Sequence, residues 1–116
     1  MESMTSVCHR FQVQPVFPDP AEKVGIALQT IGTLPIHALR IFPEGGTSGW
    51  YIWAGGEMST DPDFFQPLHI CHLDQYCPEL VPYLGLPPGW RVLLAPNHED
   101  VWFDPALIQG KNYELG

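Results

Sequence analysis

The residues best suited to chemistry are His69, Cys71 and His72, followed by Cys77. Imidazole and thiolate groups are the usual zinc ligands, and a cysteine paired with a histidine can act as an activated nucleophile. The spacing matches no common zinc module, however, and neighbouring residues on a helix or strand point apart rather than forming a dyad. We therefore interpret the cysteines as small buried residues. A small metal-dependent or cysteine hydrolase using the His69–Cys77 cluster stays as the alternative function.

Two pairs of carboxylates could also serve acid–base chemistry or hold magnesium, namely Asp61 with Asp63 and Glu99 with Asp100. No glycine-rich phosphate loop and no serine nucleophile motif accompanies them. Asp61 and Asp63 are also suited to beginning a helical turn, and Glu99 and Asp100 fall in a predicted hairpin turn. The sequence therefore predicts no catalytic residue, no metal site and no cofactor, and we do not expect an enzyme.

These groups lie in or beside the stretch Gly49–Asp104, which contains all four tryptophans of the chain. Tryptophans on strands more often belong to the core than to a ligand platform, because each buries a large apolar area. Trp50 and Trp53 are three residues apart, so on one regular strand they face opposite sides of a sheet. We therefore expect one of the two to be exposed as an interface anchor. The stretch is interpreted as both the core and an acidic recognition surface.

The elements that would position these residues are short strands separated by turns rich in proline and glycine. Residues 36–42 and 50–53 form a predicted β-hairpin around a turn-rich loop at 43–49. Residues 90–95 are almost entirely apolar and predict an inner strand, which a turn at 96–100 connects to a last strand at 101–103. Alternating apolar residues also indicate a strand at 11–13 that ends at Pro15.

Helical signals are fewer and shorter. Residues 78–85 predict a short helix, with Pro78 in the first turn and Gly85 at the C-terminal cap. Residues 21–31 fit a helix or a strand, and the strand is favoured because Gly25 weakens a helix. Three other segments are less regular: residues 60–65 fit one helical turn, 68–76 have a mixed pattern, and 106–108 could form a turn.

The fold class predicted from this order is α+β. We expect a small antiparallel sheet of about four to five strands with one or two short helices packed on it. Residues 1–116 would form a single domain, and residues 1–9 and 110–116 would be loosely held.

The charge balance limits the possible partners. The formal net charge is −8, and the five basic residues are scattered singly along the chain. Direct nucleic-acid binding is therefore not expected, because it requires clustered Lys and Arg to neutralise phosphates. A basic protein partner is the natural complement of an acidic surface.

The chain also lacks the signals of export and membrane insertion. No apolar run approaches the ~18 residues of a membrane span, and the first residues do not resemble a signal peptide. Three cysteines, an odd number, do not indicate a disulfide framework. We expect a cytoplasmic protein that does not associate with membranes.

Several short motifs occur in a familiar order: Ser48–Trp53, Gly56-Glu57, Asp61–Phe65, Pro78–Leu80, Tyr83-Leu84, Leu86–Arg91 and Glu99–Asp104. Together they resemble immunity protein family thirty-three of the bacterial polymorphic-toxin systems. The resemblance covers roughly residues 36–108. It implies a protein that binds and neutralises a cognate toxin, delivered by a type VI or contact-dependent secretion system. An adaptor domain of a secretion apparatus is a further alternative.

The acidic balance favours a toxin with a basic active-site face, and nucleases, DNases in particular, are the commonest such case. The carboxylates expected to contact this toxin are Glu57, Asp61, Asp63, Glu99, Asp100 and Asp104. Tyr51 or Trp53 is expected to be the apolar anchor between them.

Overall fold

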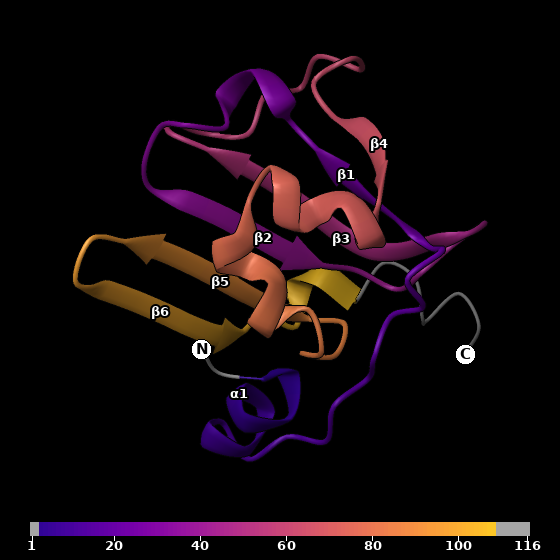
Figure 1. Cartoon of the computed structure of the whole chain (residues 1–116), viewed down its shortest axis with the longest axis vertical. Helices are drawn as coiled ribbons and strands as arrows, with labels where there is room; N and C mark the ends of the chain where they lie inside the picture. The colour runs from indigo at the N-terminus through magenta and orange to yellow at the C-terminus, as the bar shows by residue number, and fades with distance from the viewer. Residues whose placement is uncertain (1–2, 109–116) are drawn as a thin grey trace.

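The computed structural model describes residues 3–108, which form a six-stranded sheet with short helical segments packed on it (Figure 1). The strands are β1 (Lys23–Ile26), β2 (Ile36–Arg40), β3 (Thr47–Ala54), β4 (Gln66–His69), β5 (Trp90–Ala95) and β6 (His98–Phe103). The α-helix is α1 (Met4–Arg10), and the 3₁₀ helices are η1 (Leu28–Thr30), η2 (Ile70–Gln75) and η3 (Pro78–Tyr83). None of the helices in this part of the chain is long and apolar enough to cross a membrane.

The strand order is β4-β1-β3-β2-β5-β6. Among the six strands of residues 3–108, β1 and β3 pair in parallel and the other neighbouring strands are antiparallel. The predicted α+β class is confirmed, with six strands rather than four to five. The predicted hairpin of β2 and β3 is also confirmed, and β5 is an inner strand between β2 and β6 as expected.

The turn between β5 and β6 is shorter than predicted. Ala95 pairs with His98, so only Pro96 and Asn97 connect the strands, with Asn97 at φ 59°. A proline followed by an asparagine in the left-handed region suits a tight turn of this kind. The prediction of a turn over 96–100 was therefore wrong in extent, and Glu99 and Asp100 belong to β6.

Strand β4 was not predicted because Pro67 interrupts its pattern. Its position explains the proline: β4 lies at the edge of the sheet and pairs only with β1. A proline is tolerated in an edge strand because its missing N–H can face away from the neighbouring strand. The segment before it forms one turn at residues 62–63, in which the Phe64 amide donates to the Asp61 carbonyl at 3.0 Å, and this turn is not part of a helix.

The N-terminal segment corrects two predictions. Residues 4–10 are the helix α1, not a loose start, and the Ser3 hydroxyl caps it by accepting a hydrogen bond from the Ser6 amide at 3.0 Å. Residues 11–13 form a turn and an irregular segment rather than a strand, with Gln12 at φ 57°. The predicted looseness of residues 110–116 lies outside the described residues.

The remaining helical predictions agree more closely with the structure. Residues 21–31 contain β1 followed by η1, which confirms the preference for a strand. Residues 68–76 include η2, and 106–108 form a helical turn. The predicted helix at 78–85 is the 3₁₀ helix η3, which is capped at Leu84 rather than at Gly85.

Both faces of the sheet are covered. On one face α1, η2 and η3 cover a large cluster centred on Trp50. On the other face the β3–β4 loop and the turn at 106–108 cover a smaller cluster around Trp53. The side chains of Trp50 and Trp53 are 1% and 5% exposed, so the expectation that one of them is exposed was wrong. The sequence does not show that the second face is covered by a loop.

Arg40 is the buried cation of the larger core and is only 2% exposed. Its guanidinium donates hydrogen bonds to four backbone carbonyls, at 2.8 Å to Val16, 2.9 Å to Ser48, 3.3 Å to Leu84 and 2.8 Å to Leu86. Burial lowers the pKa of Arg40 to about 10, so the group is charged at neutral pH. Arg40 thereby joins the N-terminal segment, the β2–β3 hairpin and the end of η3.

Candidate functional site

One end of the sheet collects most of the predicted contact residues. Strands β1, β3 and β5 end there and β2, β4 and β6 begin there, because the two sets run in opposite directions. Four strands are aligned at this end of the sheet, because Ala54 of β3 pairs with Ile36 of β2, Ile36 with Leu94 of β5, and Leu94 with Glu99 of β6. We call residues 31–35, 55–65 and 96–100 the strand-end rim; the β5–β6 turn marks it at the left of Figure 1.

Five of the six predicted carboxylates lie on this rim. Glu57, Asp61 and Asp63 are exposed on the β3–β4 loop, and Glu99 and Asp100 lie near the start of β6. Asp104 follows the C-terminal end of β6 and therefore lies at the opposite end of the sheet. The topology thus brings two acidic segments to one end although about forty residues separate them in sequence.

The β3–β4 loop is held by its own polar side chains. The Asp61 carboxylate accepts a hydrogen bond from the Asp63 amide at 2.9 Å, and the Ser59 hydroxyl accepts one from the Asp61 amide at 3.0 Å. The Gln66 side-chain amide donates to the Asp63 carbonyl at 2.9 Å. Such turns place short acidic side chains at the surface without a helix. The loop therefore presents its carboxylates in a defined arrangement.

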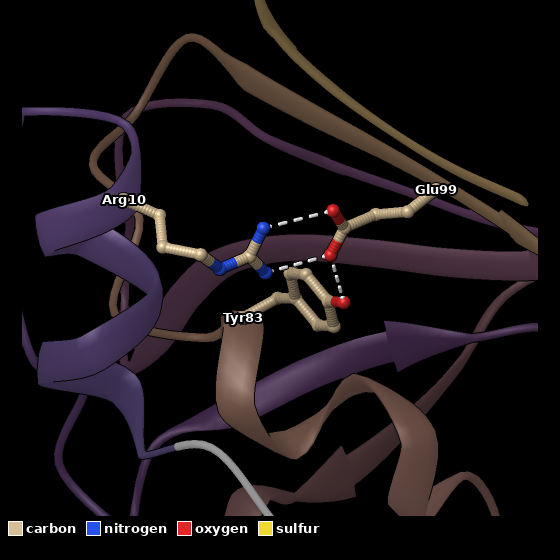
Figure 2. Close-up of polar contacts among 3 residues, drawn as sticks. All are labelled: Arg10, Tyr83 and Glu99. Carbon is tan, nitrogen blue, oxygen red and sulfur yellow. Dashed lines mark hydrogen bonds and ion pairs between the residues drawn. The ribbon is translucent and has the colours of Figure 1, made fainter.

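Glu99 is engaged within the protein (Figure 2). Arg10 donates to both of its oxygens, at 3.0 Å from Nη1 to Oε1 and 2.8 Å from Nη2 to Oε2, and the Tyr83 hydroxyl donates to Oε2. The bonds from Arg10 and Tyr83 lower the pKa of Glu99. Burial, together with the bond to Glu99, raises the pKa of Tyr83 to about 12, so Tyr83 stays a donor at neutral pH. We call these three residues the Glu99 clamp.

The clamp joins α1, η3 and β6, and its other members were not identified from the sequence. Arg10 lies 89 positions before Glu99, and Tyr83 lies 16 positions before it. Neither separation corresponds to a helix or hairpin contact, so no local pattern connects them. Glu99 therefore helps to hold the fold as well as lying on the rim.

Two other predicted carboxylates also have partners in the chain. Asp104 accepts from Arg91 Nε at 2.8 Å and from the Ala106 amide at 3.0 Å, which fixes the turn after β6. Asp100 lies 3.0 Å from the imidazole Nε2 of His98, and both side chains are more than half exposed. Asp104 is thus mainly structural, whereas Asp100 stays accessible.

The predicted aromatic anchors are less accessible than expected. Trp53 is buried, stacks on the His37 ring at 4.9 Å and donates its indole N–H to the Gly56 carbonyl at 3.1 Å. Tyr51 is half-buried, with its ring 5.1 Å from that of Phe65. Both rings therefore mainly support the β3–β4 loop.

An open groove of about 640 Å³ lies within the rim. Its apolar lining includes Leu34, Ile36, Leu94 and Pro96, and its polar lining includes Tyr83, Glu79, His98 and Glu99. Leu34 is 55% exposed, so the groove offers an accessible apolar contact beside carboxylates. The sequence did not identify this groove because its walls come from three separate segments.

The His69–Cys77 cluster lacks the geometry of a catalytic centre. Cys77 is 1% exposed, and burial together with the Glu79 charge raises its pKa to about 12, so it is protonated and a poor nucleophile. Cys71 is exposed, so the expectation of a buried residue was wrong for this cysteine, and the rings of His69 and His72 are 6.3 Å apart. Among residues 3–108, no group of three or more potential ligands could hold a metal ion.

The described cations are largely used inside the fold. Arg10 binds Glu99, Arg91 binds Asp104 and Arg40 is buried, while Lys23 lies on β1 near the opposite end from the rim. Glu57, Asp61, Asp63 and Asp100 stay exposed. The strand-end rim therefore carries exposed carboxylates, and the apolar groove lies beside its segments 31–35 and 96–100.

Comparison with known protein families identifies a match. The family model of the Imm33-like domain matches residues 3–104, nearly the whole chain and more than the resemblance expected over 36–108. A search of curated proteins finds no match. A search of solved structures finds none either.

Proposed function

Since the chain belongs to the Imm33-like family, we propose that it is a non-catalytic immunity protein that inhibits a cognate bacterial toxin by binding it. The match includes α1 and all six strands, so it extends to the elements that form the strand-end rim. The buried, protonated Cys77 supports binding rather than the alternative of a cysteine hydrolase.

The main support for a positively charged partner is the distribution of charge on this protein. The net charge is −8, and the arginines at residues 10, 40 and 91 are engaged inside the fold, whereas rim carboxylates face solvent. Such a surface attracts a positively charged partner over distances of about 8–10 Å at moderate salt. A nuclease presents a basic groove for phosphates, so we propose a nuclease toxin, with a DNase as the first candidate, whose groove is covered by the rim.

Within this proposal the predicted contact residues take different roles. Glu57, Asp61, Asp63 and Asp100 are exposed and would contact the toxin directly. Glu99 and Asp104 would act mainly by holding α1, η3 and the β6 end in place. Leu34, rather than Tyr51 or Trp53, has the exposure expected of an apolar anchor at the rim. Delivery of the toxin by a type VI or contact-dependent system, and a cytoplasmic site of action, belong to the same proposal.

The test compares one charge reversal on the rim with a matched reversal at the opposite end. Glu57→Lys changes the rim, whereas Glu44→Lys makes the same change of charge in the β2–β3 loop. The probe is the toxin domain encoded beside this chain, inactivated at its catalytic site. We expect Glu57→Lys to slow association about threefold or more at low salt and Glu44→Lys to have a smaller effect. If the two variants slowed association equally, the proposal that the rim contacts the toxin would be contradicted.

A further inference from the structure

The two edges of the sheet differ in their capacity to accept another strand. The β4 edge has only four residues and contains Pro67. The β6 edge has six residues, contains no proline and stays in unbroken register with β5 from His98 to Phe103. A regular edge of this length presents unpaired backbone groups that can pair with another chain.

The backbone groups that face outward on β6 can be assigned from the hairpin. With a two-residue turn, Ala95 and His98 form a hydrogen-bonded pair, and every second residue of β6 then bonds to β5. The Asp104 amide, which donates to the Gly89 carbonyl at 2.7 Å, continues this inward series. The N–H and C=O groups of Glu99, Val101 and Phe103 therefore point away from β5. Within residues 3–108, these three residues form no backbone hydrogen bond outside the ladder.

The side chains along this edge combine apolar surface with negative charge. Trp102 is 41% exposed and Phe103 is 46% exposed, and Asp100 is exposed beside them. Trp102 and Asp100 share one face of the strand because side chains alternate, so an approaching strand would meet an aromatic ring and a carboxylate together. An acidic edge disfavours chance pairing with acidic chains and favours a strand that carries Lys or Arg opposite Asp100.

We propose that a strand of the toxin pairs with the outer edge of β6 and extends the sheet. This inference rests on the proposed function and adds the mode of binding, since backbone pairing would position the toxin and the rim carboxylates would select its charge. A second copy of this chain is a less suitable occupant, because two molecules of net charge −8 repel each other. Helix α1 does not pair with the backbone of β6 within the described residues. It packs mainly on η3, and its Arg10 contacts the side chain of Glu99 at the start of β6.

The direct test is amide hydrogen exchange in the unmodified protein, alone and with the inactivated toxin domain encoded beside it. In the free protein, we expect fast exchange at Glu99, Val101 and Phe103 and slow exchange at Asp100 and Trp102. In the complex, the three outward amides should slow by about tenfold or more. Binding of the toxin without this slowing would overturn the β6 pairing and leave the proposed function standing. Absence of binding would overturn both.

A proline substitution gives a second, independent test. Val101→Pro removes an outward donor and keeps the inward bonds of its neighbours, whereas Val101→Ala shortens the same side chain and retains the donor. We expect Val101→Pro to weaken toxin binding about tenfold or more relative to Val101→Ala. If Val101→Pro does not fold, Phe103→Pro and Phe103→Ala form the equivalent pair. Equal affinities within a pair would contradict the proposal, as would dimers of this chain that compete with the toxin.

Discussion

At the scale of single residues, Glu99 shows how one carboxylate can lie on the proposed recognition surface and also hold the fold together. Arg10 and Tyr83 use three hydrogen bonds to connect it to α1 and η3. Its charge is therefore largely compensated within the molecule. This is why a charge reversal at Glu99 would report on folding as well as on toxin binding, whereas Glu57 has no such role.

Because of the Glu99 clamp, the variant Glu99→Gln should be less stable than the unmodified protein, by an amount that depends on pH. The folded-state pKa of Glu99 is below its usual value of 4.5, so its stabilisation is fully present above pH 4.5 and is lost as the pH falls through the folded pKa. We expect Glu99→Gln to lower the free energy of unfolding by about 1 kcal/mol at neutral pH, since the pair is partly exposed. The difference from the unmodified protein should shrink below pH 4.5 in urea titrations. Asp63→Asn is the control and should change stability by less than about 0.5 kcal/mol.

Replacing Arg40 should lower the free energy of unfolding much more than replacing Glu99. Arg40→Met would leave the carbonyls of Ser48 and Leu86 buried without their donor, so the free energy of unfolding should fall by about 3–5 kcal/mol. Lys23→Met removes an exposed cation from β1 and should cost less than about 0.5 kcal/mol. Urea denaturation of both variants measures the difference. Equal stabilities would show that Arg40 does not join these segments.

At the scale of elements, the β5–β6 hairpin depends on close contact at Gly89. This residue has φ 101°, and a Cβ there would lie 2.4 Å from the Phe103 ring. Gly89→Ala should therefore displace Phe103, fray the end of β6 and lower the free energy of unfolding by about 2 kcal/mol.

Gly56→Ala provides the matched control for this substitution, because a Cβ at Gly56 would meet no atom within 4 Å. Its stability should stay within about 0.5 kcal/mol of the unmodified protein. Thermal and urea unfolding of the two variants test the prediction, and a Gly89→Ala protein as stable as Gly56→Ala would contradict it.

The elements that could be predicted from sequence are those with a continuous local pattern. Strands β3 and β5 contain continuous apolar or aromatic runs, and β2 is marked by the turn-rich loop that follows it. The helix η3 begins at a proline suited to the first turn. Strand β4 could not be recognised, because its proline is acceptable only at a sheet edge and edge position is a property of the tertiary structure. Helix α1 was missed because it is seven residues long and depends on packing against η3.

At the scale of the whole molecule, the sequence indicated the acidic character of the surface but not its arrangement. Two acidic groups meet at one end of the sheet because of the order and direction of the strands: Glu57, Asp61 and Asp63 in one group, and Glu99 and Asp100 in the other. Contacts between segments distant in sequence determine that order. The burial of Trp53 depends on the loop that covers the second face. The groove next to Leu34 likewise exists only once three segments are assembled.

The charge of the whole molecule predicts a strong dependence of toxin association on salt. Because Glu57, Asp61 and Asp63 form no ion pair within residues 3–108, the association rate should fall by about tenfold or more between low and physiological ionic strength. The dissociation rate should change much less. Stopped-flow mixing with the inactivated toxin domain measures both, and an association rate independent of salt would contradict a charge-driven encounter.

The central claim is that this protein neutralises a toxin by forming a stoichiometric complex, and titration of toxin activity tests it most directly. Purified protein is added in steps to a fixed concentration of the active toxin domain encoded beside it, and the remaining activity is measured. We predict a linear fall to complete inhibition at one equivalent, with an apparent Kd well below micromolar. Undiminished toxin activity in the presence of a large excess of the protein would contradict the account.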